Sequence, residues 1–85
     1  MKIIEMYEYT IGKHFLPCLI NGDYSGLNDE EVEIIDNFED QLGDILEKEN
    51  AYTWNVEYTE CYNYSKCELT GMFGEVADVQ IVFMK

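Results

Sequence analysis

The sequence predicts one small α+β domain over residues 1–85, in which two helices cover one face of a four-stranded, mostly antiparallel sheet. Three observations lead to this prediction. Apolar residues recur every three or four positions through Gly26–Glu49, which is typical of an amphipathic helix. Apolar residues alternate with polar ones over 52–59 and again near the C-terminus, which indicates strands. A length of 85 residues with a hydrophobic fraction of 47% is enough for a single modest core.

The expected order of elements is β-α-α-β-β-β, beginning with a strand and a short helix. Lys2–Tyr9 alternates in the manner of a strand, and Thr10–Gly12 is expected to turn. Lys13–Ile20 then has a helical apolar face, in which Pro17 is acceptable only near the helix start because a later proline removes a backbone hydrogen bond. Asn21-Gly22 is a natural helix end, since either residue tolerates the left-handed backbone conformation.

The segment Gly26–Glu49 is predicted to be one acidic amphipathic helix. Asn28 is its expected N-cap, and Glu31 completes a capping box that satisfies backbone N–H groups in the first turn. Gly43 interrupts the run and marks the place where a bend or fraying would occur. The stripe expected to face the core consists of Val32, Ile35, Phe38, Leu42 and Ile45.

The last third of the chain is expected to supply three strands. Residues 52–59 alternate most clearly and have an aromatic face, and Glu60-Cys61 leaves room for a hairpin turn into residues 62–69. Ala77–Met84 is predicted to lie centrally in the sheet, because both of its faces carry apolar residues. The strand residues expected to pack against the long helix are Trp54, Val56, Val79, Ile81 and Phe83.

The charge of the chain restricts its partners. It has 18 acidic residues against five lysines and no arginine, for a formal net charge of −13 at pH 7. Such a surface repels nucleic acid and anionic lipid and attracts basic surfaces. The absence of arginine also removes the bidentate group that binds phosphate or carboxylate substrates. We therefore expect a basic protein partner, with neither direct nucleic-acid binding nor membrane association.

Signatures of catalysis and of targeting are lacking. With one histidine and no motif of an activated serine or cysteine, the sequence favours a non-enzymatic protein without a cofactor. Glu5 and Glu8 interrupt the apolar run that a signal peptide needs, and the longest apolar run, Phe15–Ile20, is too short to span a membrane. An odd number of cysteines fits free thiols in a reducing compartment. The expected location is the cytoplasm.

The turn before the long helix partly matches a calcium-binding loop. Residues suited to positions one, three, five, six and nine of the helix–loop–helix calcium pattern are present as Asn21, Asp23, Ser25, Gly26 and Asp29. Position twelve of that pattern requires a bidentate glutamate, and here it is Val32. The preferred interpretation is a polar turn whose residues serve backbone geometry, without a specific metal site.

The histidine and the cysteines form a second candidate metal set. His14 and Cys18 are four residues apart, so a helix would place them on one face, and Cys61 and Cys67 would complete a zinc site. The spacing of the last two is wider than that of usual zinc ligands, and Pro17 disturbs the helical register of the first pair. Small core thiols and an ordinary histidine are the preferred interpretation.

The charge pattern of the long helix leads to a functional hypothesis. Ten carboxylates between Asp29 and Glu49 lie along about 30 Å of helix. Their spacing of about 3 Å is close to the roughly 3.4 Å phosphate repeat of one DNA strand. The chain would then be an acidic interaction protein that occupies a basic nucleic-acid-binding protein as DNA does, although such charges often serve only solubility. The residues assigned to this acidic face are Glu33, Asp36, Glu39, Asp40, Asp44 and Glu47.

The aromatic strand gives an alternative function. A negative protein is unsuited to stacking bases, so Tyr52, Trp54 and Tyr58 are interpreted as core or as the interface of a protein–protein module or small oligomer. The two hypotheses differ in their response to salt. Electrostatic occupation of a DNA-binding groove weakens steeply with ionic strength, whereas an apolar interface is nearly indifferent to it.

The segment Leu19–Glu31, with the sequence Leu-Ile-Asn-Gly-Asp-Tyr-Ser-Gly-Leu-Asn-Asp-Glu-Glu, resembles a motif of small acidic proteins of bacteriophages and conjugative elements. In that family a strand and a short helix precede the motif and an Asp-Val-containing strand ends the chain, as Asp78-Val79 does here. The resemblance implies this fold and a mobile-element setting, but no activity. Some unrelated acidic proteins of such elements are DNA mimics that block restriction or CRISPR systems, and this analogy favours an inhibitor.

Overall fold

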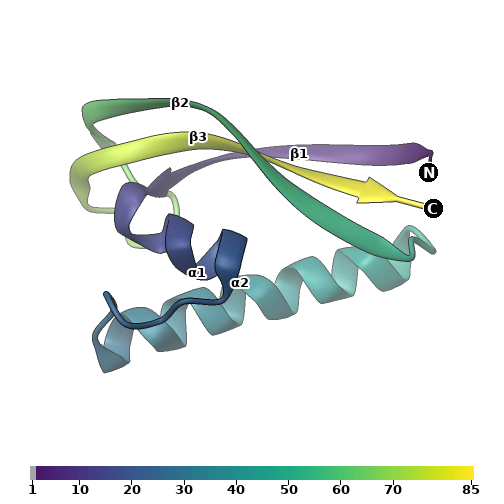
Figure 1. The fold of residues 1–85 in the computed structure, drawn as a ribbon, viewed down its shortest axis with the longest axis horizontal. Coiled ribbons are helices and arrows are strands. Elements are labelled where there is room, and N and C mark those ends of the chain that lie inside the picture. The colour runs from purple at the N-terminus through teal and green to yellow at the C-terminus, as the bar shows by residue number, and fades with distance from the viewer. Residues whose placement is uncertain (1) are drawn as a thin grey trace.

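The computed structural model describes residues 2–85, with the side chains of residues 2–57 and 65–85. The elements are β1 (Ile3–Gly12), the 3-10 helix η1 (Lys13–Phe15), α1 (Leu16–Asn21), α2 (Asp29–Lys48), β2 (Thr53–Lys66) and β3 (Phe73–Met84). The strands β1 and β2 each pair antiparallel with β3, so the sheet order is β1-β3-β2. The helices lie together on one face of this sheet, and α2 extends along its length (Figure 1). The predicted α+β class, with helices on one face of an antiparallel sheet, is confirmed.

All four predicted strand segments contribute to the sheet, but two of them are joined. The segments 52–59 and 62–69 form most of one long strand, β2, so the sheet has three strands. No turn occurs at Glu60-Cys61. Instead, the pairing of β2 with β3 shifts register between Tyr58 and Glu60, and again between Tyr62 and Ser65. Such irregularities bend a strand without ending it, which explains why the pattern resembles a hairpin in the sequence.

The beginning of the chain follows the prediction with one change. β1 continues through Thr10–Gly12, where a turn was expected, because these residues pair with Val76–Asp78 of β3. Pro17 lies in the first turn of α1, the position where a proline is tolerated. The helix ends at Gly22, whose φ of 69° places it in the left-handed region, as predicted.

The long helix α2 has the predicted cap. The Asn28 side chain accepts a hydrogen bond from the Glu31 backbone N–H at 2.9 Å, and the Asn28 N–H donates to the Glu31 carboxylate at 3.0 Å. This capping box starts the helix at Asp29, later than the predicted Gly26. The helix also passes through Gly43 and ends only at Lys48, so the glycine does not terminate it.

The core lies between the helices and the sheet. Of the residues predicted on α2, Ile35, Phe38 and Leu42 are buried, whereas Val32 and Ile45 near the two ends of the stripe are half-buried. On the strands, the predicted Val79, Ile81 and Phe83 of the central β3 are buried, and Trp54 and Val56 of the edge strand β2 are half-buried. Further buried residues come from β1 and the short helices, including Ile11, Phe15, Leu16 and Leu19.

Candidate interaction surface

The acidic residues predicted on α2 lie on the side of the helix away from its buried stripe. An α-helix has 3.6 residues per turn, so the buried residues Ile35, Phe38 and Leu42 lie on one side of α2 and its opposite side faces solvent. Five of the six predicted acidic residues are exposed, and Glu39, nearest the core, is half-buried. The members of the acidic face are Glu33, Asp36, Glu39, Asp40, Asp44 and Glu47.

This acidic face is displaced toward α1. The Tyr24 hydroxyl, in the turn after α1, lies 3.3 Å from carboxylate oxygens of both Asp36 and Glu39. The buried Cys18 thiol of α1 lies 3.7 Å from the same Glu39 oxygen. A hydrogen bond with Cys18 and then the charge of Glu39 raise the pKa of Tyr24. Burial is the main cause that raises the pKa of the Cys18 thiol.

The other side of α2 has a different character. There Ile34, Asn37 and Gln41 line a hollow of about 250 Å³ against Glu68 and Leu69, the residues that follow β2. The helix residues that line this hollow carry no charge.

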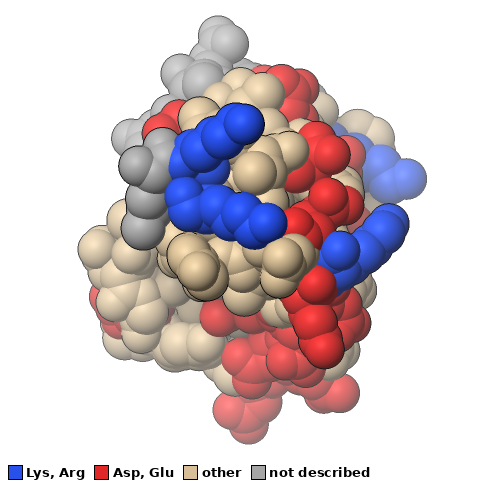
Figure 2. Space-filling model, turned by 90° about the vertical axis from the view of Figure 1, so that its right-hand side faces the viewer, with Lys and Arg blue, Asp and Glu red and all other residues tan. Residues whose placement is uncertain are grey.

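Little positive charge lies near the acidic face. Among the side chains of 2–57 and 65–85, the ion pairs are Lys13 with Glu75 at 3.9 Å and His14 with Glu31 at 2.8 Å, and neither involves the acidic face. Figure 2 shows carboxylates down one side of the molecule and gathered at its bottom, the level at which α2 lies in Figure 1, and lysine side chains over the middle and upper parts, where they lie close to some carboxylates. Lys48, in the last turn of α2 and four residues after Asp44, is the one lysine of this helix, and among the described side chains no ion pair joins it to the acidic face.

The structure describes two of the three residues of the predicted aromatic face, and they differ in exposure. Tyr52 precedes β2 and is 80% exposed, whereas Trp54 inside the strand is half-buried against the core. The side chain of Tyr58 lies outside the part that the structure describes. Side chains alternate between the two faces of a sheet only within a paired strand, and Tyr52 lies just before β2 begins at Thr53.

A groove that the sequence did not reveal separates α1 from β2. It has a volume of about 400 Å³ and is lined by Leu19, Ile20, Trp54, Asn55, Val56 and Glu57. Ile20 was expected on the apolar face of the short helix, but it is 46% exposed, because Leu16 and Leu19 take the positions that face the core. In the sequence, Ile20 is simply an apolar residue near the end of a short helix, which resembles a core residue and does not by itself indicate a groove.

The turn proposed as a calcium loop uses its oxygens for backbone geometry. An Asp23 carboxylate oxygen accepts a hydrogen bond from the Ser25 N–H at 3.0 Å, and Asn28 is engaged in the capping box. Hydrogen bonds from the side chain and backbone of Ser25 lower the pKa of Asp23. Among the described side chains, no three His, Cys, Asp or Glu residues converge in a way that would hold a metal ion.

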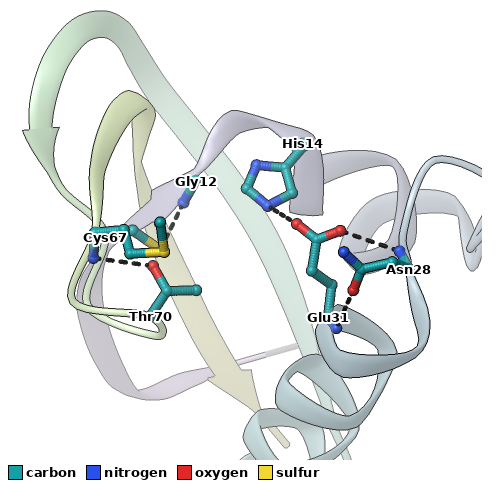
Figure 3. A network of polar contacts seen from close by, with 7 residues as sticks. Gly12, His14, Asn28, Glu31, Cys67 and Thr70 are labelled. Carbon is teal, nitrogen blue, oxygen red and sulfur yellow. Dashed lines mark hydrogen bonds and ion pairs between the residues drawn. The ribbon is translucent and has the colours of Figure 1, made fainter.

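The histidine and the cysteines considered for zinc have separate partners. His14 is held by Glu31 and its ring lies 4.2 Å from that of Phe15. The buried Cys67 sulfur accepts the backbone N–H of Gly12 at 3.1 Å, away from His14 (Figure 3). Cys18 points toward Glu39, and the side chain of Cys61 is outside the described residues. The structure therefore does not bring His14, Cys18 and Cys67 together.

The fold and this surface define a small α+β domain with one strongly acidic helix. The chain belongs to a family described as a domain of unknown function (DUF6926), whose model matches residues 8–83 and so includes both helices and most of the sheet. No curated protein and no solved structure gives a significant match. Within residues 2–85, the helices are all too short or too polar to cross a membrane.

Proposed function

We propose that this chain is a non-enzymatic interaction protein that binds a basic protein surface through the acidic face of α2. One observation carries the proposal: the carboxylates of this face are mostly exposed, and no described cation pairs with them. Exposed like charges on one side of a rigid helix attract an oppositely charged surface and speed its encounter. The capping box and the buried stripe hold that helix in place, so the charges are presented in a fixed arrangement.

The more specific form of the proposal is a DNA-mimic inhibitor that acts in the cytoplasm on a nucleic-acid-binding protein. The geometry of the helix supports it, because the carboxylates of the acidic face, from Glu33 to Glu47, extend over about 21 Å, one per about 4 Å, which is near the roughly 3.4 Å phosphate repeat of one DNA strand. The resemblance of Leu19–Glu31 to a motif of small acidic phage and conjugative-element proteins supports a mobile-element setting, in which inhibitors of basic DNA-binding proteins have a role.

The test is a pull-down from a bacterial lysate at low and moderate salt, with two variants of equal net charge. The first neutralises the acidic face with Glu33→Gln, Asp40→Asn, Asp44→Asn and Glu47→Gln, and leaves the partners of Tyr24 intact. We expect the wild type to enrich basic nucleic-acid-binding proteins, with a steep loss between about 50 and 200 mM salt. The first variant should lose most of this enrichment even at low salt.

The control variant removes the same number of charges elsewhere, through Glu5→Gln, Glu8→Gln, Glu30→Gln and Glu75→Gln. These four side chains are exposed and lie outside the acidic face. We expect the control variant to retain its partners, because the position of the charges matters more than their sum. Equal retention by both variants, or no enrichment of basic proteins by the wild type, would rule out the acidic face as the binding site.

The alternative is a protein–protein module that uses its aromatic strand. The exposure of Tyr52 and the position of Trp54 on the groove beside α1 favour it. Binding of this kind would persist at moderate salt in the pull-down and would survive neutralisation of the acidic face.

A further inference from the structure

The first half of β2 is a free sheet edge. Residues 53–57 pair in regular register with 80–84 of β3, and in the sheet of residues 2–85 no other strand lies on their outer side. Unpaired N–H and C=O groups along such an edge are a template for an added strand. This edge can therefore accept an extended segment of another chain.

The opposite edge of the sheet is less available at the end of β1, around Thr10–Gly12. The end of β1 is covered by the chain after β2, since the Glu68 N–H donates to the Thr10 carbonyl and the Thr10 N–H donates to the Glu68 carboxylate. The Gly12 N–H is likewise engaged, by the Cys67 sulfur. The hollow beside β1 is lined mainly by polar side chains, namely Glu8, Thr10, Glu68, Asp78 and Gln80.

The edge at β2 instead adjoins the groove between α1 and β2. Leu19 and Ile20 form one wall of this groove, and Trp54 and Val56 on the core side of β2 form the other. A strand added beside 53–57 would direct every second side chain into the groove, because side chains alternate between the two faces of a sheet. Those side chains should be apolar, to match these walls.

The charges around the groove determine which side chains the added strand should have on its other face, the one that points away from the groove. Glu57 lines it and, two residues before it, Asn55 shares the face of β2 that points away from the helices. The acidic face of α2 is displaced toward α1, as the contacts of Tyr24 with Asp36 and Glu39 show. Glu57 is the charged residue that lines the groove, so an added strand would have negative charge beside its outer face, which is complementary to lysine or arginine.

We propose that the groove between α1 and β2 binds an extended segment of a partner protein in which apolar residues alternate with basic ones, and that this segment adds as a strand to the edge at 53–57. The proposal rests on the part of the proposed function that assigns a basic protein as the partner, and it names the form in which that partner is bound.

The test uses a short fluorescein-labelled peptide of alternating valine and lysine, with binding followed by fluorescence anisotropy at low salt. One control peptide has serine in place of valine, and a second has N-methyl groups that prevent strand pairing. The protein variants are Ile20→Ser in the groove and Ile3→Ser on β1, both at exposed isoleucines, 46% and 60% respectively, so that both variants are expected to fold. The fold is checked by thermal melts.

We expect the valine–lysine peptide to bind more tightly than either control peptide and to slow amide hydrogen exchange within 53–57. Ile20→Ser should weaken its binding by roughly fivefold to tenfold, the loss of one partly buried aliphatic contact, while Ile3→Ser should change it by less than about twofold. No binding of the valine–lysine peptide, equal binding of the N-methylated peptide, or equal affinities of the two variants would overturn the proposal.

The variant that neutralises the acidic face, with Glu33→Gln, Asp40→Asn, Asp44→Asn and Glu47→Gln, separates this proposal from the proposed function; it is called the acidic-face variant. If the valine–lysine and serine–lysine peptides bind alike and both are lost in that variant, the acidic face binds basic chains but the groove does not. If peptide binding depends on Ile20 while the acidic-face variant keeps all its lysate partners, the groove proposal stands and the proposed function of α2 fails.

Discussion

Replacement of Phe38 by alanine tests the packing on which the acidic helix depends. Phe38 is 3% exposed, and its ring meets that of Tyr9 edge-on, with the centroids 4.9 Å apart. Emptying a core site of this size costs about 3–5 kcal/mol. The free energy of unfolding of a chain of 85 residues is about 4–13 kcal/mol, so Phe38→Ala should remove a large part of it.

Urea denaturation followed by circular dichroism measures this loss, with Tyr52→Ala as the matched control. Tyr52 is 80% exposed, so its truncation should change the free energy of unfolding by less than about 0.5 kcal/mol. The thermal midpoint of Phe38→Ala should fall by roughly 12 °C or more. A loss below about 1 kcal/mol, or one equal to that of the control, would show that α2 does not pack on the sheet through Phe38.

Three further predictions concern the same helix and its neighbours. Gly43→Ala should stabilise the protein by about 1 kcal/mol, because a methyl group there would meet no atom within 4 Å and alanine favours the helix; a lower thermal midpoint would contradict this. Asn28→Ala should cost about 1 kcal/mol in urea melts through loss of the cap, and an unchanged midpoint would show that the capping box adds nothing. The pKa values of Cys18 and Tyr24 are raised in the folded state, so folding favours their protonated forms. Their contribution to the free energy of unfolding is therefore complete below their unfolded-state pKa values and should be lost as pH rises above about 9. In melts across that pH range, the stability of a Cys18→Ala, Tyr24→Phe double variant should decline less than that of the wild type. An equal decline would show that these two groups do not cause the pH dependence.

Features encoded by neighbouring residues could be predicted from the sequence. The capping box of Asn28 and Glu31, the stripe of Ile35, Phe38 and Leu42, and the left-handed end of α1 at Gly22 each depend on a few adjacent positions. The continuity of β2 could not be predicted in this way. Its register shifts depend on the partner β3, whereas the sequence around 60–61 alone resembles a turn.

The candidate surface was predictable in part. The spacing of the carboxylates placed them on one face of α2, but the side toward which this face turns is set by the contacts of Tyr24 and Cys18 with Asp36 and Glu39. The groove beside β2 was missed for a related reason. Leu19, Ile20, Trp54 and Val56 all look like core residues in the sequence, but Ile20 is exposed because Leu16 and Leu19 take the positions of α1 that face the core.

The acidic face also carries a cost for the free protein. Asp36, Asp40 and Asp44 follow one another at intervals of four residues, and each such like-charge pair destabilises a helix by about 0.2–0.5 kcal/mol. Lys48, four residues after Asp44, is the one lysine of α2 and offsets at most one of these pairs. A basic partner would remove the repulsion on binding, whereas salt would screen it in the free protein and weaken the complex at the same time. Stability should rise with salt whichever role the charges have, so an affinity for a basic partner that falls as salt rises is the behaviour that distinguishes a binding surface from a helix whose charges serve solubility alone.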